Sequence, residues 1–284
     1  MEVAIRKPEA QRMGFFTDTT VCIGCKACEV ACKQWNDLPA DDLRSSLSYD
    51  ATRELSASTW RHVRFVETLT IPEPDPTLNL VEAALGAELD RWVFMSDVCK
   101  HCTHAGCLDA CPTGALIRTE FETVIVQPDV CNGCGYCVPS CPFGVIDRDP
   151  YDGRAAKCTL CYDRLEDGLE PACAKACPTD SIQFGPYEEL VERAQGRVAT
   201  LHERGIEGAY LYGAGDAPED ALAGGLGAFF LLTEPPERYG LPAHAQSPSQ
   251  QNGPIATAAG LAAAFTAVGV TLASFAAAYR KGRR

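Results

Sequence analysis

CNGCGYCVPSCP, residues 131–142, is the stretch of sequence that decides the fold. Its cysteines are spaced Cys-x2-Cys-x2-Cys-x3-Cys-Pro, the arrangement in which thiolates hold [4Fe–4S] clusters. Three cysteines separated by pairs of residues let a tight loop wrap one face of an iron–sulfur cube, and the fourth is directed toward a neighbouring cube. Pro142 then ends the loop, because its ring fixes φ and its nitrogen has no hydrogen to donate.

The same grouping accounts for every cysteine in the chain. The sixteen cysteines form four quartets, at positions 22, 25, 28 and 32; 99, 102, 107 and 111; 131, 134, 137 and 141; and 158, 161, 173 and 177. The phrases ACPTGALI (110–117), SCPFGVID (140–147) and ACPTDSIQF (176–184) repeat around the last cysteine of three quartets. This internal repeat predicts two ferredoxin-like halves that together hold four [4Fe–4S] clusters.

Disulfides and structural zinc are the alternative uses of so many cysteines. Disulfides favour small secreted scaffolds with wider spacing, and cysteines that share a tight loop are badly placed to bridge one another. Zinc sites also use Cys-x2-Cys pairs, but they usually join two distant pairs. Three of these quartets instead carry four cysteines within 13 residues. The pattern therefore favours iron–sulfur clusters over both alternatives.

Charge and motif content argue against other function classes. The 284 residues carry a formal net charge of −13, which argues against a nucleic-acid partner. The sequence has no GxGxxG, no P-loop and no nucleophile motif. We therefore expect no catalytic residue on this chain, and we expect its array of one-electron clusters to transfer electrons.

Several cationic and imidazole side chains stand beside cysteines. His101 and His104 flank Cys102; because four cysteines are available for each cluster, we expect both histidines to be neighbours or surface groups rather than ligands. Four lysines would raise the potential of a nearby cluster if they face it, and the alternative for each is a solvated or structural lysine. They are Lys26, Lys33, Lys100 and Lys157.

Hydrophobic periodicity predicts mixed helices and strands around the quartets. The expected strands are 60–66, 92–95, 115–118, 124–126 and 181–184. The expected helices are a short one through Val30, Ala31 and Trp35 and a longer one over 187–204, which ends before Gly205. Residues 71–76 read as a Pro-rich loop, Tyr210–Gly215 as a loop, 206–250 as a surface excursion and 242–254 as a polar linker.

Residues 255–279 contain no charge and predict a membrane-spanning helix. At 1.5 Å per residue the segment is about 37 Å long, enough to cross a hydrocarbon core with some tilt. Its bulky residues share one stripe, and its other faces are Ala, Gly and Thr, which favour packing against further spans. The alternative is a soluble Ala-rich helix that packs through the bulky stripe.

The charges around this segment predict its orientation. Arg280, Lys281, Arg283 and Arg284 follow it, and the fifteen residues before it contain no Lys or Arg. By the positive-inside rule, the C-terminus is cytoplasmic and the cluster domain lies on the opposite side. Residues 1–20 have no apolar core, so we expect no signal peptide and export together with a signal-bearing partner. The alternative is a cytoplasmic cluster domain whose short tail has crossed the membrane.

The predicted fold class is α+β, with two pseudo-symmetric ferredoxin-like modules, each of the bacterial two-cluster type, and one C-terminal transmembrane helix. Residues 1–90 hold the first cluster segment and an insertion, and 150–186 complete this outer half. Residues 91–149 form the inner two-cluster module. Residues 187–254 are a helix with a surface and linker region, 255–279 the span and 280–284 a basic tail.

These segments resemble the iron–sulfur subunits of membrane-bound molybdenum or tungsten oxidoreductases, and within them the beta subunits of respiratory formate dehydrogenases. The matching segments are VCIGCKACEVACKQWNDL (21–38), LSASTWRHVRF (55–65), CKHCTHAGCLDACPTGA (99–115), CNGCGYCVPSCPFGV (131–145), KCTLCYDRLEDGLEPACAKACPTDSIQFG (157–185) and RYGLP (238–242). With the C-terminal span, the resemblance covers nearly the whole chain. Relatives that replace one cysteine and hold a [3Fe–4S] cluster match less well, because all sixteen positions are cysteine here.

The resemblance implies crossed ligation of four clusters. The four implied ligand sets are Cys22, Cys25, Cys28 and Cys177 (cluster 1); Cys158, Cys161, Cys173 and Cys32 (cluster 2); Cys99, Cys102, Cys107 and Cys141 (cluster 3); and Cys131, Cys134, Cys137 and Cys111 (cluster 4). Spacing alone predicts only that the fourth cysteines cross over.

The resemblance also implies partners and a direction of electron flow. A molybdopterin subunit would oxidise formate and reduce the clusters. A polytopic membrane subunit, either a cytochrome b or a haem-free protein, would receive the electrons for quinone. The span would lie in lipid against that subunit. The alternatives are an iron–sulfur subunit of a membrane-bound hydrogenase or another molybdoenzyme, and a stand-alone polyferredoxin.

Overall fold

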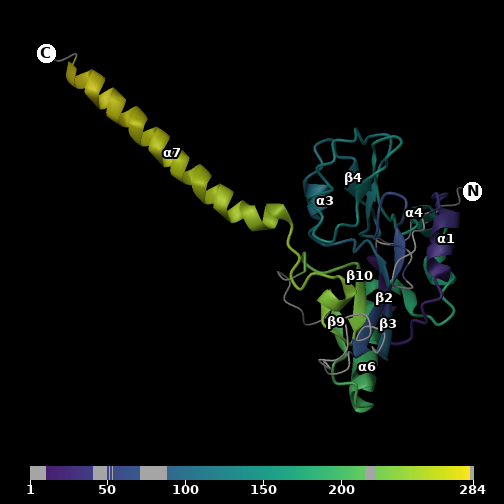
Figure 1. Ribbon diagram of the computed structural model, residues 1–284. Coiled ribbons are helices and arrows are strands. Elements are labelled where there is room, and N and C mark those ends of the chain that lie inside the picture. Colours follow the sequence, from purple (N-terminus) through teal and green to yellow (C-terminus); the bar gives the residue numbers. More distant parts are fainter. Residues whose placement is uncertain are drawn as a thin grey trace, which may run out of the picture.

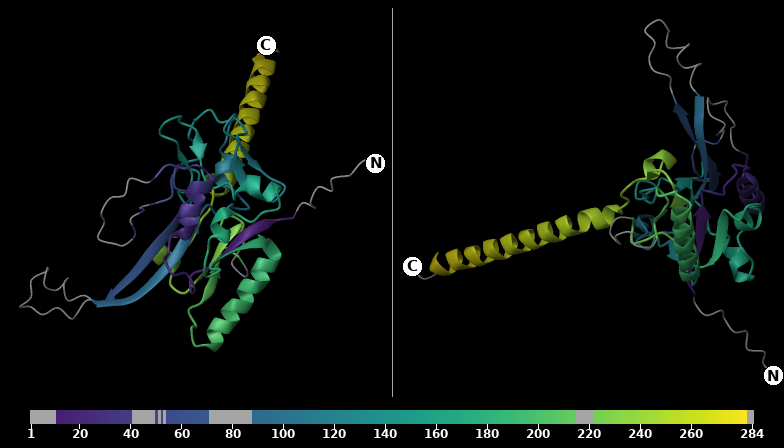
Figure 2. Two further views of the ribbon diagram at one scale, coloured as in Figure 1. Left: turned by 90° about the vertical axis from the view of Figure 1, so that its right-hand side faces the viewer. Right: turned by 90° about the horizontal axis from the view of Figure 1, so that it is seen from below.

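The computed structural model describes residues 11–40, 50, 52, 54–70, 88–214 and 222–281. Helices and strands are mixed in one body, from which a single long helix projects (Figure 1, Figure 2). The strands are β1 (Met13–Asp18), β2 (Arg61–Thr70), β3 (Glu88–Val98), β4 (Leu116–Arg118), β5 (Val124–Val126), β6 (Asp147–Arg148), β7 (Ala155–Ala156), β8 (Ile182–Pro186), β9 (Tyr210–Tyr212) and β10 (Ala228–Leu232). The helices are α1 (Ala27–Trp35), α3 (Gly106–Asp109), α4 (Tyr162–Glu166), α5 (Ala172–Lys175), α6 (Tyr187–Glu203), the 3-10 turn η1 (Pro236–Tyr239) and α7 (Pro248–Lys281).

A four-stranded sheet in the order β8-β1-β10-β9 ties the two ends of the cluster region together. β1 precedes the first quartet and pairs antiparallel with β8, which follows the fourth quartet. On its other edge β1 pairs in parallel with β10. Residues more than 160 positions apart are therefore neighbours in one sheet.

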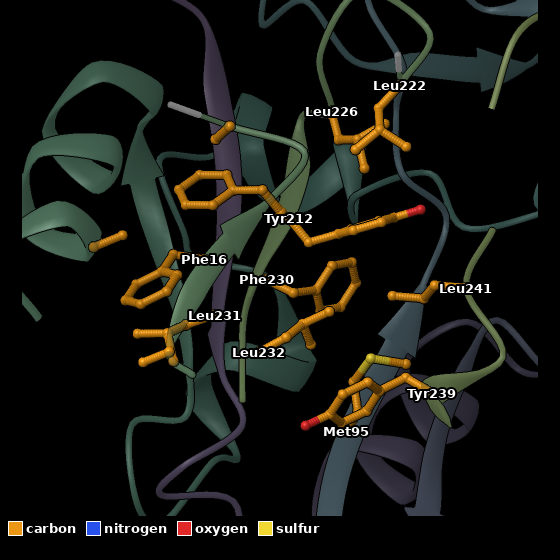
Figure 3. Close-up of a cluster of buried hydrophobic side chains, with 14 of the residues drawn as sticks. Phe16, Met95, Tyr212, Leu222, Leu226, Phe230, Leu231, Leu232, Tyr239 and Leu241 are labelled. Carbon is orange, nitrogen blue, oxygen red and sulfur yellow. The ribbon is translucent and has the colours of Figure 1, made fainter. Parts of the chain in front are cut away.

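The main hydrophobic core lies between this sheet, α6 and the β2–β3 ribbon. All five residues of β10, AFFLL, are buried. Figure 3 shows Phe230 facing Tyr212, with Met95 and Tyr239 beyond it on the side of the β2–β3 ribbon. The rings of Phe16 and Phe229 stack with centroids 5.5 Å apart, which joins β1 to β10. Aromatic packing of this kind adds to the free energy gained from burial alone.

The prediction that residues 206–250 form a surface excursion was wrong, because β10 is the most buried strand of the sheet. A strand covered on both faces is a continuous apolar run without alternation, so periodicity does not reveal it. The loop predicted at Tyr210–Gly215 was also wrong, since β9 occupies 210–212. The expected linker is partly packed: Ala245 and Ser247 are buried, and the Tyr212 hydroxyl donates to the Pro242 carbonyl at 2.6 Å.

The β2–β3 ribbon confirms the strands predicted at 60–66 and 92–95 and extends both. The loop predicted at 71–76 lies outside the described residues. Phe65 and Phe94 pack edge to face at 4.8 Å, and Trp92 joins them. β4 and β5 confirm the hairpin predicted between the second and third quartets, and β8 confirms the strand predicted after the fourth. α6 confirms the predicted helix, with Gly205 at φ +83° beyond its end.

Helix α1 forms where it was predicted, but a different face is buried. Val30 is 62% exposed and Trp35 is 45% exposed, whereas Cys28, Glu29 and Cys32 are buried. The helix turns its cysteines inward against α5, so the ligands and not the apolar side chains set its orientation.

Helix α7 leaves the body on the side away from α1 (Figure 1, Figure 2). Its first turn contacts α3. A Cβ on Gly106 of α3 would lie 2.5 Å from the Ser140 carbonyl oxygen and 2.8 Å from the Ser247 Cβ, so only glycine permits this approach. Among the described residues, one stretch, Gln250–Ala276, is long and apolar enough to cross a membrane, and none of it is buried.

Candidate metal centres

Two cavities gather cysteines from different quartets. Cys22, Cys25, Cys28 and Cys177 line one cavity. Cys99, Cys102, Cys107 and Cys141 line a second cavity. Each cavity combines the first three cysteines of one quartet with the last cysteine of another, as the crossed arrangement requires. We call these groups centre 1 and centre 3.

The other eight cysteines also form two groups, identified by their mutual electrostatic effects. Burial raises the pKa of Cys158, and the charges of Cys32, Cys161 and Cys173 raise it further, as does that of Cys99 from centre 3. Burial likewise raises the pKa of Cys137 to about 11, and Cys111, Cys131 and Cys134 add to the rise. We call the first group (Cys32, Cys158, Cys161, Cys173) centre 2 and the second (Cys111, Cys131, Cys134, Cys137) centre 4.

The loops that begin the four quartets share one backbone feature. The second residue after the first cysteine has positive φ in every loop. These residues are Gly24 (φ +68°), His101 (φ +44°), Gly133 (φ +74°) and Leu160 (φ +59°). A left-handed residue here turns successive N–H groups and thiols toward one centre, which is how backbone nests bind anions. The non-glycine residues accept the left-handed strain that glycine avoids.

The donors fit [4Fe–4S] clusters. All sixteen cysteines are free, so none is used in a disulfide. No three Cys, His, Asp or Glu side chains among the described residues converge on the position of a single metal ion, as a zinc site requires. Backbone N–H groups also point at sulfur: Ala155 donates to Cys131 at 3.4 Å and Leu160 to Cys158 at 3.3 Å. Such hydrogen bonds tune cluster potentials.

The electrostatic effects of the cysteines connect the centres as a row in the order 1, 2, 3, 4. Burial is the main cause of the raised pKa values at Cys28, Cys158 and Cys107, and a cysteine of the next centre adds to each. The charge of Cys173 raises the pKa of Cys28, that of Cys99 raises the pKa of Cys158, and that of Cys137 raises the pKa of Cys107. At the two ends of the row, Cys25 of centre 1 and Cys134 of centre 4 are the two exposed cysteines of the chain.

Most of the lysines picked out from the sequence are neutralised or bound by the protein. Lys26 pairs with Glu29 at 3.2 Å, and Lys100 pairs with Asp97. Lys33 donates to the Ser58 carbonyl at 2.8 Å. Lys157 is buried as well, but it donates to two carbonyls, those of Cys158, at 3.0 Å, and of Val124, and not to a carboxylate.

The two histidines beside Cys102 differ in burial. His101 is buried and lines the cavity of centre 3, and its Nδ1 accepts a hydrogen bond from the Val124 N–H at 3.1 Å. His104 is exposed. The four cysteines of centre 3 leave neither histidine needed as a ligand.

Sequence reasoning missed Arg61, which is 1% exposed and donates to the Cys173 sulfur at 3.1 Å. The alternation of residues 60–66 predicted only a strand there. The alternation itself could have indicated a functional role, because it places Arg61 on the same strand face as the buried Val63. A charged side chain at an inward strand position needs a partner in the interior.

Comparisons with known proteins agree with this geometry. Residues 21–115 and residues 90–187 each match a family described as "4Fe-4S dicluster domain". The formate dehydrogenase iron–sulfur subunit of Haemophilus influenzae is 43% identical over 79% of this chain and 67% of its own length. This chain belongs to the family of formate dehydrogenase iron–sulfur subunits.

Other relatives place this chain in a wider group. The nitrate-inducible formate dehydrogenase iron–sulfur subunit of Escherichia coli is 42% identical over 79% of this chain and 70% of its own length. The B subunit of the anaerobic dimethyl sulfoxide reductase of Escherichia coli is 33% identical over 62% of this chain and 75% of its own length. The two dicluster domains and the sixteen cysteines mean four [4Fe–4S] clusters.

Proposed function

We propose that this chain is the electron-transfer subunit of a formate-oxidising molybdoenzyme. The observation that carries the proposal is the unbroken row of four cysteine centres with one exposed cysteine at each end. When bound, each [4Fe–4S] cluster accepts and releases one electron. The chain's own residues hold the four sites in sequence, exclude water from the middle of the row and leave its ends accessible to partners.

The crossed ligand sets of centres 1 to 4 are part of the proposal. The two shared cavities support the sets of centres 1 and 3, and the mutual repulsion of thiolates supports centres 2 and 4. We also propose the nested division, with 91–149 as the inner module and 1–90 plus 150–186 as the outer half. The pairing of β1 with β8 supports this division, because it joins the two parts of the outer half.

A membrane anchor is proposed for α7. Its large apolar residues are exposed, for example Phe265 at 76% and Phe275 at 72%. Leaving so much apolar surface in water is unfavourable, and lipid or other transmembrane helices would cover it. The basic residues after the helix support a cytoplasmic C-terminus and a cluster domain outside, exported with a signal-bearing partner. The opposite topology is the alternative outcome.

The row and the anchor also support positions for the partners. α7 begins against α3, which carries Cys107, and this contact favours centres 3 and 4 on the membrane side. Helix α1, which carries Cys28 and Cys32, lies on the far side of the body (Figure 1, Figure 2). We propose that the molybdopterin subunit meets centre 1 and that a quinone-reducing membrane subunit meets centre 4. That membrane subunit is either a cytochrome b or a haem-free polytopic protein.

The test is low-temperature EPR of the anaerobic, detergent-purified complex before and after addition of formate. Reduced-cluster signals that appear with formate would support the proposed donor. Signals that appear with dithionite but not with formate would retain the four-cluster row and reject formate, and hydrogen would be the next donor to test. Absence of cluster signals with every reductant would reject the proposal as a whole.

A further inference from the structure

Arg61 is a fully buried cation near the cluster sites. It opens β2 and is 1% exposed. Its Nη2 donates to the Cys173 Sγ at 3.1 Å, and its Nη1 donates to the carbonyl and the hydroxyl oxygens of Ser96, both at 3.3 Å. The guanidinium carbon lies 4.7 Å from the centroid of the Phe15 ring. The side chain is therefore fixed on three sides.

No carboxylate of the described residues balances this charge. Within the part of the chain that the structure describes, no Asp or Glu lies within ion-pair distance of Arg61, and its buried Nε has no hydrogen-bond partner. Burial of an uncompensated cation is strongly unfavourable. The sulfurs that its guanidinium reaches are that of Cys173, directly at 3.1 Å, and that of Cys28, through the Ser96 hydroxyl. The counter-charge of Arg61 is therefore cysteine sulfur.

These sulfurs belong to two centres. Cys173 is in centre 2 and contacts Arg61 directly. Cys28 is in centre 1, and its sulfur lies 3.2 Å from the Ser96 hydroxyl that Arg61 also contacts. When Cys28 is a thiolate, that hydroxyl donates to it. One buried cation thus touches centre 2 and reaches centre 1 through a single hydroxyl.

We propose that Arg61 raises the reduction potentials of centres 1 and 2 together, so that electrons entering the row are held on its first two members. The inference rests on the proposed function only in taking these cysteines as cluster ligands. Each reduction adds one negative charge to a cluster and its thiolates, and a fixed positive charge beside them favours the reduced form. Lys26 and Lys100 cannot act in the same way, since each is paired with a carboxylate.

The experiment is an EPR-monitored redox titration of the purified complex carrying Arg61→Gln, Arg61→Lys or the control Arg91→Met. Glutamine keeps a hydrogen-bond donor and removes the charge, whereas lysine keeps the charge and loses the planar fork. Arg91 lies on the same ribbon but is exposed and pairs with Glu234 at 2.7 Å. We expect R61Q to raise the oxidised-to-reduced ratio of two clusters about tenfold at a fixed potential, equivalent to about 59 mV for one electron. R61K should shift the potentials of both clusters by a smaller amount, and R91M should leave both potentials unchanged.

Two outcomes would overturn the inference. One is an R61Q complex with four loaded clusters and unchanged potentials; the other is a shift of equal size in R91M. If R61Q fails to load its clusters, Ser96→Ala provides the second test, because it keeps the cation and removes the link to Cys28. S96A should lower the reduction potential of centre 1 and leave that of centre 2 unchanged. An unchanged potential of centre 1 contradicts the proposal. Failure of formate to reduce a complex whose clusters shift as expected would reject the donor and not the role of Arg61.

Discussion

Phe15 of β1 lies directly opposite Phe184 of β8, and their rings meet edge to face with centroids 5.9 Å apart. One residue precedes the first quartet and the other follows the fourth. The contact is therefore the point at which the two ends of the cluster region are joined. Phe15 is fully buried and also lies against the guanidinium of Arg61.

Phe15→Ala should destabilise the outer half of the molecule. Deletion of a buried phenylalanine ring costs about 3–5 kcal/mol, and here it also removes the aromatic surface beneath a buried cation. We expect a chelator to release iron faster from centres 1 and 2 than from centres 3 and 4. Val30→Ala, at an exposed position on α1, is the control and should leave the rates unchanged. Uniform release from all four centres would contradict a separable outer half.

Gly133→Ala should prevent assembly of centre 4. Gly133 has φ +74°, and a Cβ there would lie 2.6 Å from the Gly153 carbonyl oxygen. Gly114→Ala is a matched control, since Gly114 has φ +69° and no atom within 4 Å of the added Cβ. We expect G133A to lose about a quarter of the bound iron, the share of one cluster in four, and G114A to keep it. Iron and sulfide analysis together with EPR measures the cluster content of both variants. Equal loss of iron in the two would attribute it to the positive φ alone and not to the contact with Gly153.

Lys157→Met should lower the potentials of centres 2 and 3. Burial would lower the pKa of Lys157, but the charges of Cys99, Cys107 and Cys158 raise it, so the lysine faces sulfurs of both centres. No carboxylate of the described residues pairs with it. We expect the oxidised-to-reduced ratio of both clusters to rise about tenfold at a fixed potential, which a redox titration followed by EPR measures. Lys175→Met, beside centre 2 on the exposed side of α5, should have little effect.

Truncation after Asn252 should release the cluster domain from the membrane. The deletion removes most of α7 but keeps Ser247 and its hydrogen bonds with Gln250, so the packing against α3 is preserved. We expect four clusters per chain and loss of the chain from the membrane fraction, measured by fractionation and iron content. Truncation after Lys281 is the control and should stay bound. A truncated chain that still sediments with membranes would show that a partner subunit alone holds it there.

Much of the site was predictable because ligand spacing is a local property. Closely spaced cysteines in a short loop specify an iron–sulfur site whatever surrounds them. The hairpin of β4 and β5 was predictable for the same reason, since its strands are close in sequence. β10 was not, because its pairing partner β1 lies more than 200 residues away and its apolar run has no period. Only tertiary contacts identify such a strand as the centre of a sheet.

The orientation of side chains was less predictable than the positions of elements. The spacing of Val30 and Trp35 indicated a helix but suggested the wrong buried face, because the cysteines of α1 determine what faces inward. Arg61 was overlooked since strands rarely place an arginine inside, and its partners come from β3 and α5. A buried charge is explained by what surrounds it in space, and those neighbours are far from it in the sequence.

The proposed nested arrangement also sets the order in which the ligand sets are completed during synthesis. The cysteines proposed for centres 3 and 4 lie between positions 99 and 141, so the ribosome completes both sites early. Centre 1 receives its fourth cysteine only at position 177, and β1 lacks its parallel neighbour until residues 228–232 emerge. The nascent polypeptide therefore exposes three thiols of the first quartet for most of its translation. The ligands proposed for centres 3 and 4 are therefore complete before those of centre 1, whose last cysteine, Cys177, is synthesised 149 residues after Cys28.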